Sequence, residues 1–238
     1  SWGRDRYWRS DHLTASQQAV DAEPNLPFLD AMKTTVIRDS RWRCDHGWDI
    51  DLDDGSSNYD IYNNLMLNQG LKLREGFRRH AWNNVMPIGS LHPHVWFQRS
   101  KDQVYANIMK GRHRTARMNK RYTDGTMVDR NLYDSQDSGI LEHAAKLGWD
   151  ENSVMGDPMY VDPTNGDFRV KEGSPALKLG FKNFPMDQFG VKKPALKAIA
   201  AVPSLLPKSR KTTAPAQKRT VVTPLVQVWL GARLKDLK

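Results

Sequence analysis

The sequence predicts an all-β fold, a parallel β-helix (solenoid) that ends in a capping segment of one helix and several turns. Apolar and polar residues alternate with period two between residues 34 and 111, for example in Trp-Asp-Ile-Asp-Leu-Asp at 48–53, as in strands with one buried face. A phrase of an aromatic residue, any residue, Asn and an aliphatic residue recurs, and its Asn positions, Asn64, Asn84 and Asn107, lie 20 and 23 residues apart. Repeats too short to bury their own apolar face indicate a solenoid, and stacked Asn side chains favour a β-helix.

Residues 1–137 are predicted to hold the coils. An earlier copy of the repeat is expected at 36–39, with Asp39 in the position of the repeated Asn. The alternation of 48–53 places Trp48 on the inner side and returns at 71–74 and 94–97, so each of these segments is expected to be a strand. Residues 111–137 are basic and irregular, which predicts a loop or a frayed last coil.

Residues 138–195 are predicted to cap the last coil. A helix is expected at 138–147, with Ser138 as its N-cap and Gly148 just past its end. Closely spaced turn formers follow, at 157–158, 162–163, 166–167 and 174–175. Such a segment would cover the strand edges and apolar cross-section that an open coil exposes.

The charge of the chain is concentrated in its last fifth. The formal net charge is +9, yet residues 191–238 contain 11 Lys or Arg and one acid, Asp236, so the remaining 190 residues are close to neutral. A basic Pro/Ala/Thr tail is more often a solvated linker than a nucleic-acid footprint, so a linker is predicted at 196–224, before a last segment at 225–238. The single cysteine, Cys44, excludes an intrachain disulfide and a zinc site of several thiolates, and no apolar run is long enough for a membrane span.

The strand pattern exposes a candidate site. If Ile50 and Leu52 point inward, the acids between them point outward, and adjacent coils about 4.8 Å apart place the next polar residues beside them. The candidate catalytic residues are Asp51, Asp53 and Asp54; the candidate substrate-binding residues are Asp49, His46, Lys72, Arg74, Glu75, His92, His94 and Trp96.

Clustered carboxylates repel, so one can hold a proton while its neighbour stays ionised. Glycoside cleavage requires such a pair, an acid for the leaving oxygen and a base or nucleophile for the other face of the sugar. Lys72 and Arg74 could hold a uronate, and Trp96 could stack on a pyranose ring.

Structural interpretations of the same residues remain open. Asp53 and Asp54 could only shape the turn at 54–58, the four acids at 49–54 could bind Ca²⁺, and Lys72 and Arg74 could form a structural ion-pair ladder with the acids. Four histidines are expected to be ordinary surface or cap residues: His12, His80, His113 and His143. Trp42, Trp48 and Trp82 are expected in the core or its turns, and Cys44 is expected to be buried.

The segments Cys44-Asp-His-Gly-Trp-Asp-Ile-Asp-Leu-Asp-Asp-Gly-Ser-Ser-Asn-Tyr59, Lys72-Leu-Arg-Glu-Gly-Phe77 and His92-Pro-His-Val-Trp-Phe97 resemble right-handed β-helix polysaccharide-active proteins of bacteria, with glycoside hydrolase family 141 the nearest named group. The turn formers of 157–175 resemble the end of many such hydrolases, so the resemblance covers about residues 1–195. It implies a secreted or periplasmic enzyme that cuts a plant or algal polysaccharide with paired aspartates in a groove. Residues 228–234 resemble the start of a PDZ-type module.

Three functions follow as alternatives: a glycoside hydrolase, a polysaccharide lyase acting by β-elimination with Lys or Arg as base, and a carbohydrate-binding β-helix without catalysis. The expected partner in each is a polysaccharide or oligosaccharide, with no nucleic acid and no membrane. No cofactor is expected, although Ca²⁺ is possible.

Overall fold

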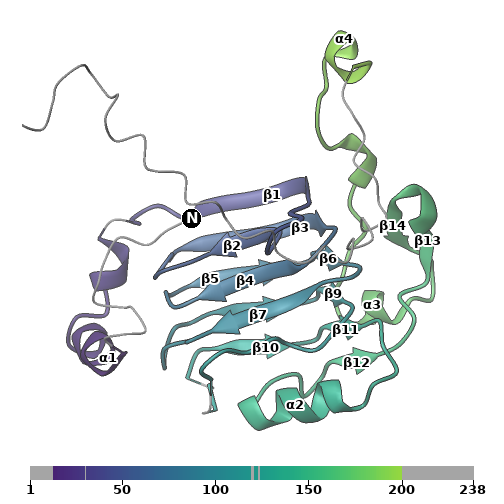
Figure 1. Cartoon of the computed structure of the whole chain (residues 1–238). Helices are drawn as coiled ribbons and strands as arrows, with labels where there is room; N and C mark the ends of the chain where they lie inside the picture. Colours follow the sequence, from purple (N-terminus) through teal and green to yellow (C-terminus); the bar gives the residue numbers. More distant parts are fainter. Residues whose placement is uncertain (1–12, 30, 119–120, 123, 200–238) are drawn as a thin grey trace, which may run out of the picture. The chain divides into compact units, whose positions relative to one another are not determined.

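The computed structural model describes residues 13–29, 31–118, 121–122 and 124–199, and these form a parallel β-helix, as predicted (Figure 1). The strands are β1 (Thr35–Trp42), β2 (Ile50–Leu52), β3 (Tyr59–Met66), β4 (Gly70–Arg74), β5 (Arg79–Trp82), β6 (Val85–Met86), β7 (Ser90–His94), β8 (Gln103–Tyr105), β9 (Ile108–Met109), β10 (Met127–Asp129), β11 (Leu132–Tyr133), β12 (Val154–Met155), β13 (Tyr160–Asp162) and β14 (Asp167–Val170). The helices are α1 (Leu13–Ala22), η3 (Leu26–Phe28), α2 (Gly139–Leu147), η4 (Pro163–Asn165), α3 (Pro175–Lys178), η5 (Met186–Gln188) and α4 (Pro194–Lys197).

Successive turns of the chain add strands to three parallel walls. The first wall is β2-β4-β7. The second consists of the N-terminal halves of β1 and β3 with β5, β8 and β10. The third consists of the C-terminal halves of β1 and β3 with β6, β9, β11 and β12, so β1 and β3 each run through the corner between two walls.

A ladder of asparagines lines that corner. Its rungs are Asn64, Asn84, Asn107 and Asn131, one from each coil. The backbone N–H of each of the first three donates to the side-chain oxygen of the asparagine in the next coil at 3.0–3.1 Å. Asn131 is the last asparagine, and its own N–H donates to Ser153 Oγ at 2.8 Å. The residue before each rung has a positive φ of 52–54°, which turns the chain from one wall into the next.

The ladder corrects one prediction and decides between the alternatives of another. The register pairs Ser40, not Asp39, with Asn64, so the earlier copy of the repeat is displaced by one residue. Of the two alternatives for residues 111–137, a loop or a frayed last coil, the structure supports the coil, because β10, Asn131 and β11 form a further coil within them. The sequence of this coil does not match the repeated motif, because Asp129 occupies the position where the other coils have an aromatic residue.

Two apolar clusters lie on opposite sides of the third wall. Met66, Met86 and Met109 point into the helix interior, whereas the residues that precede each of them belong to an outer cluster. That outer cluster is completed by Phe168, Phe181 and other apolar residues between 168 and 186, so this later part of the chain covers the outside of the third wall. Helix α2 adds Ile140, Ala144 and Leu147 to the interior cluster and crosses the end of the stack (Figure 1). Its bounds agree with the predicted helix, and Gly148 ends it with a φ of 80°.

The outside of the second wall carries a stack of rings. Trp82 lies between Tyr62 and Tyr105 with centroid distances of 4.5 and 6.1 Å, and Arg38 and Arg130 lie over the two outer rings. Trp82 is therefore not in the core, whereas Trp42 packs against the interior apolar cluster, as expected. Cys44 is only partly buried.

Helix α1 and η3 pack through Val20, Leu26 and Phe28 on the stacked pair Phe77 and Phe97. Residues 200–238, which hold most of the predicted linker and the whole predicted PDZ-like segment, lie outside the described residues. No helix among the described residues is long and apolar enough to cross a membrane.

Candidate functional site

The outer face of the first wall brings together seven of the candidate site residues singled out in the sequence. The register aligns Asp51, Lys72 and His92 in one row across the three strands. Arg74 and His94 form the next row, and Asp53 joins it through an ion pair. We call Asp51, Asp53, Asp54, Lys72, Arg74, His92, His94 and Trp48 the first-wall cluster.

Two cations hold the three carboxylates of the first-wall cluster. Lys72 Nζ lies 3.1 Å from Asp51 Oδ1 and 3.1 Å from Asp53 Oδ1. Arg74 Nη1 lies 3.1 Å from Asp53 Oδ1 and 3.0 Å from Asp54 Oδ1. The side chain of Lys72 is only 6% exposed, while that of Asp51 is 39% exposed, so solvent reaches the cluster mainly at Asp51.

Trp48 covers one side of this network. Lys72 Nζ lies 4.3 Å from the centroid of its ring, and the His92 and His94 rings meet its edge or face at 5.6 Å. The prediction that Trp48 points inward is wrong, because β2 begins only at Ile50 and Trp48 belongs to the preceding loop. The sequence therefore assigned the aromatic residue of this face to the wrong position.

The electrostatics of the cluster favour an ionised Asp53 and neutral imidazoles at His92 and His94. Burial acts to raise the pKa of Asp53, but the hydrogen bond from Lys72 and the charges of Lys72 and Arg74 outweigh it and hold that pKa below its usual value. Burial lowers the pKa of His92 to about 4. Burial, reinforced by the same two cations, also lowers the pKa of His94. At neutral pH both imidazoles are uncharged and can accept a proton or a hydrogen bond.

Trp96, predicted to stack on a sugar, is not available to a ligand. It is 2% exposed, its Nε1 donates to Leu73 O at 2.7 Å, and its ring packs on Trp149 at 5.0 Å. The strand ends at His94, and Val95 has a φ of 50°, so the alternation read from the sequence stops one residue before Trp96.

Asp49 and Glu75 are also buried. Asp49 accepts hydrogen bonds from the backbone N–H groups of Cys44, Asn68 and Gly70 at 2.8–2.9 Å, and so ties the loop before β2 to the turn before β4. Burial raises its pKa, against the effect of those bonds. Glu75 is fully buried, with Oε1 3.4 Å from Arg74 Nε. His46 is exposed in the same loop as Trp48.

The turn after Asp53 supports the structural interpretation beside the functional one. Asp54 has a φ of 41°, its N–H donates to Asp53 Oδ1 at 3.1 Å, and Ser56 Oγ donates to Asp53 O at 2.7 Å. Both aspartates thus shape the turn, and they also pair with Arg74. Within the described part of the chain, no group of three or more His, Cys, Asp or Glu residues is arranged to hold a metal ion.

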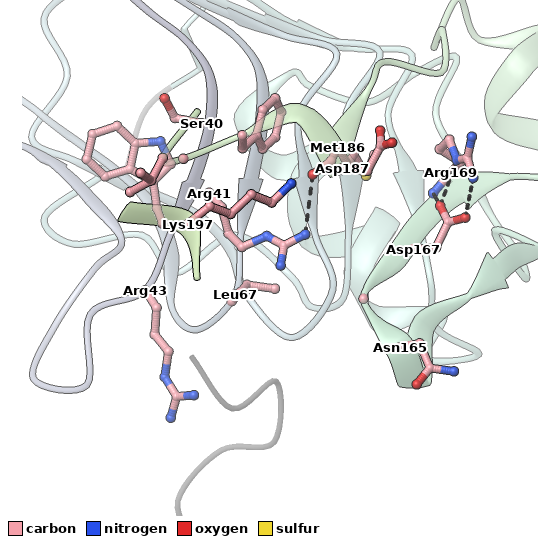
Figure 2. Close-up of a pocket in the computed structure, with 15 residues that line it drawn as sticks. Ser40, Arg41, Arg43, Leu67, Asn165, Asp167, Arg169, Met186, Asp187 and Lys197 are labelled. Carbon is pink, nitrogen blue, oxygen red and sulfur yellow. Dashed lines mark hydrogen bonds and ion pairs between the residues drawn. The ribbon is translucent and has the colours of Figure 1, made fainter. Parts of the chain in front are cut away.

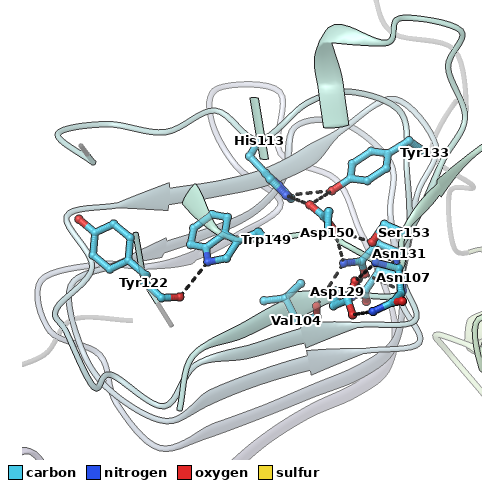
Figure 3. Close-up of polar contacts among 11 residues, drawn as sticks. Val104, Asn107, His113, Tyr122, Asp129, Asn131, Tyr133, Trp149, Asp150 and Ser153 are labelled. Atoms are coloured by element: carbon cyan, nitrogen blue, oxygen red, sulfur yellow. Dashed lines mark hydrogen bonds and ion pairs between the residues drawn. The ribbon is translucent and has the colours of Figure 1, made fainter. Parts of the chain in front are cut away.

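A buried polar cluster was not predicted (Figure 3). His113 Nε2 lies 2.7 Å from Asp150 Oδ2, and Tyr133 OH donates to the same oxygen at 2.7 Å. Asp150 Oδ1 accepts from Ser153 and Asn131, so the cluster joins the last rung of the ladder. His113 is 2% exposed, so its expected surface position is wrong; its partner lies 37 residues away, and no local pattern links the two. Closed to solvent, this cluster offers no open surface to a ligand.

A cavity of about 790 Å³ lies between the C-terminal part of β1 and the chain from 165 to 197 (Figure 2). It shares no residue with the first-wall cluster. Its lining includes four cationic side chains and two carboxylates: Arg41, Arg43, Arg169, Lys197, Asp167 and Asp187.

Comparisons with known proteins gave no match to a family model, to a curated protein or to a solved structure.

Proposed function

We propose that the first-wall cluster binds a polysaccharide and hydrolyses its glycosidic bonds, with Asp51 and Asp53 as the paired carboxylates. The observation that supports this most directly is that Lys72 Nζ contacts an oxygen of both, each at 3.1 Å. The two oxygens therefore lie no farther apart than twice that distance. Such a pair on an outer strand face is the arrangement that cleavage of a sugar acetal needs.

The separation favours a retaining mechanism. Carboxyl groups of retaining glycosidases lie about 5–5.5 Å apart, whereas inverting enzymes need about 6.5–9.5 Å to admit a water. Asp53, kept ionised by Lys72 and Arg74, would attack the anomeric carbon while Asp51 gives its proton to the leaving oxygen. Water, deprotonated by Asp51, would then release the sugar from Asp53.

The exposure of the side chains fits these roles. Asp51 is the most exposed of the three carboxylates, at 39% against 18% for Asp53 and 13% for Asp54, so a sugar oxygen reaches it first. Lys72 Nζ contacts Asp51 in the free protein, so proton donation by Asp51 to the leaving oxygen requires the bound sugar to draw Lys72 toward Asp53. Neutral His94 beside them can accept a hydrogen bond from a sugar hydroxyl.

A second function, carbohydrate binding without cleavage, is favoured by the completeness of the ion pairs. Asp51, Asp53 and Asp54 each have a cation at 3.0–3.1 Å, and a network of paired charges can bind a carbohydrate without any proton transfer. For either function the resemblance to polysaccharide-active β-helix proteins supports a secreted or periplasmic setting.

The test incubates the chain with pectic, xylan and fucosylated glycans and follows new reducing ends and ultraviolet absorbance together, with binding measured by calorimetry. Hydrolysis produces reducing ends without absorbance, and Asp51→Asn and Asp53→Asn should each abolish it. Asp134→Asn is the matched control, because Asp134 is partly exposed and paired with Lys110 on another wall. Absorbance at new chain ends would replace hydrolysis by elimination. Binding without new ends would leave the second function, and neither binding nor cleavage would refute both.

A further inference from the structure

The cavity beside β1 contains cations that have no carboxylate partner within the described part of the chain. Arg43 pairs with Asp45 at 2.8 Å, and Arg169 makes two bonds to Asp167, at 2.8 and 2.6 Å. Arg41 and Lys197 have no such partner among the residues described. Among the described residues, two of the four cations that line the cavity, Arg43 and Arg169, are thus paired with a carboxylate, and Arg41 and Lys197 are not.

The guanidinium of Arg41 is partly buried and makes few hydrogen bonds to the described residues. Its Nε is buried and has no hydrogen-bond partner among the described residues, and Nη2 makes one long bond to Met186 O, at 3.4 Å. Figure 2 shows the Arg41 side chain directed at Met186 inside the cavity, while Arg43 extends away from it. The described residues thus hold the guanidinium through one long bond only, which leaves donors of Arg41 for an acceptor that enters the cavity.

The rest of the lining indicates what carries the acceptor. The lining also holds the polar residues Ser40, Asn165 and Asp187 and a set of apolar side chains: Trp42, Leu67, Met186, Phe189 and Val191. The volume of about 790 Å³ lies within the range of small-molecule sites. A guanidinium binds a carboxylate through two parallel hydrogen bonds, and an indole accepts the apolar face of a sugar ring.

We propose that this cavity is a binding site for a sugar acid of one or two rings, whose carboxylate is held by Arg41 and Lys197 and whose ring lies on the apolar wall that includes Trp42. The site is independent of the proposed hydrolase, because it takes no residue from the first-wall cluster and its occupation breaks no bond. It would let the protein hold an acidic glycan end apart from the carboxylates of the first wall.

The test is calorimetric titration of the whole chain with galacturonate, with its neutral methyl ester and with inorganic phosphate and sulfate. Galacturonate should bind saturably, and its affinity should fall as the salt concentration is raised. The ester should bind at least about tenfold more weakly than galacturonate. Arg41→Gln should weaken galacturonate binding about tenfold or more, and Lys197→Gln, on exposed α4, about threefold. Because Arg41 is partly buried, Lys197→Gln keeps the test decisive if the first variant folds poorly.

Arg38→Gln is the matched control. Arg38 lies on the same strand, outside the cavity lining, and is paired with Asp39 at 3.1 Å, so its loss should change binding less than about twofold. Equal affinity for the acid and its ester, unchanged affinity in Lys197→Gln, or phosphate and sulfate binding as tightly as galacturonate would each overturn the proposal. Absence of any galacturonate binding would overturn it as well.

Discussion

Replacing Asn84 with alanine tests how much the asparagine ladder contributes to stability. The side chain is fully buried, and its amide nitrogen lies 2.9–3.0 Å from Ile61 O, Trp82 O and Asn107 Oδ1. Its Oδ1 accepts from the backbone N–H of Asn64 at 3.0 Å and from the Asn64 amide at 3.1 Å. Alanine removes all of these contacts and supplies none.

The expected loss follows from what remains unpaired. The amide has two hydrogens, so two donated bonds are lost at about 1 kcal/mol each, and the orphaned Asn64 N–H costs about 1–3 kcal/mol more. We therefore expect Asn84→Ala to lower the free energy of unfolding by about 3–5 kcal/mol, a large share of a typical domain's stability.

Two further variants make the test specific. Ser153 Oγ serves the rung after Asn131, so Asn84→Ser should retain an acceptor for Asn64 N–H and lose less than Asn84→Ala. Asn152 is exposed and bonds only to Asp129 among the contacts found, so Asn152→Ala should stay within about 0.5 kcal/mol of the parent chain. Urea unfolding followed by circular dichroism measures all three, with equal m-values as the condition for comparison. A loss below about 1 kcal/mol for Asn84→Ala would show that water replaces the ladder bonds.

Three other outcomes are expected. Burial lowers the pKa of His92 from 6.5 to about 4, while the unfolded chain still takes up the proton near 6.5, so the free energy of unfolding should fall by up to about 1.4 kcal/mol per pH unit as the pH drops from 6.5 to 4. His92→Gln should therefore reduce the dependence of the urea midpoint on pH, and an unchanged dependence would contradict this. A Cβ on Gly70 would lie 2.3 Å from Ser90 O at a φ of 89°, so Gly70→Ala should cost about 3 kcal/mol or more in urea unfolding, whereas Gly47→Ala, with open space around it, should leave the midpoint unchanged; equal effects would refute the close approach of the coils. Asp150→Asn breaks a buried pair with His113 and should cost about 3–5 kcal/mol, against about 1 kcal/mol for Tyr133→Phe, and thermal unfolding of the two variants gives the order.

The β-helix could be predicted because its signals are periodic and local. Parallel strands stack in register, so a repeat of 20 to 23 residues predicts which segments meet, and Lys72 does align with Asp51. On the third strand the residues beside Lys72 and Arg74 are His92 and His94, whereas the alternation predicts His94 and Trp96. The recurring Asn is equally direct, since each rung binds the same atoms of the next coil.

The ends of strands could not be predicted in this way. Period two says which face a residue takes only while the strand lasts, and nothing in the sequence marks Val95 as a turn residue, since β-branched side chains rarely adopt positive φ. Trp96 was therefore assigned to the outside and Trp48 to the inside, although the structure reverses both. His113 failed for a different reason, because only the fold brings Asp150 to it.

One signal for the third wall was present in the sequence. Leu65-Met66, Val85-Met86, Ile108-Met109 and Leu132-Tyr133 put two apolar residues side by side, which alternation on a half-exposed strand does not explain. The structure explains it, because the first residue of each pair contacts the chain from 168 to 186 and the second faces the interior.

The three walls thus differ in what their outer faces leave for a ligand. The third wall is covered by the chain's own later segment, and the rings on the second wall stack face to face, so they present edges rather than the open faces that a sugar stacks on. The first wall instead carries a lysine that is 6% exposed between two carboxylates, an arrangement that well-packed apolar residues could replace without loss of stability. Asp53 and Asp54 also shape a turn, but the exposed Asp51 and the buried Lys72 have no such part in it, so recognition or catalysis is our hypothesis for these two residues. This is the physical reason for seeking the function of the described residues first on the face formed by β2, β4 and β7.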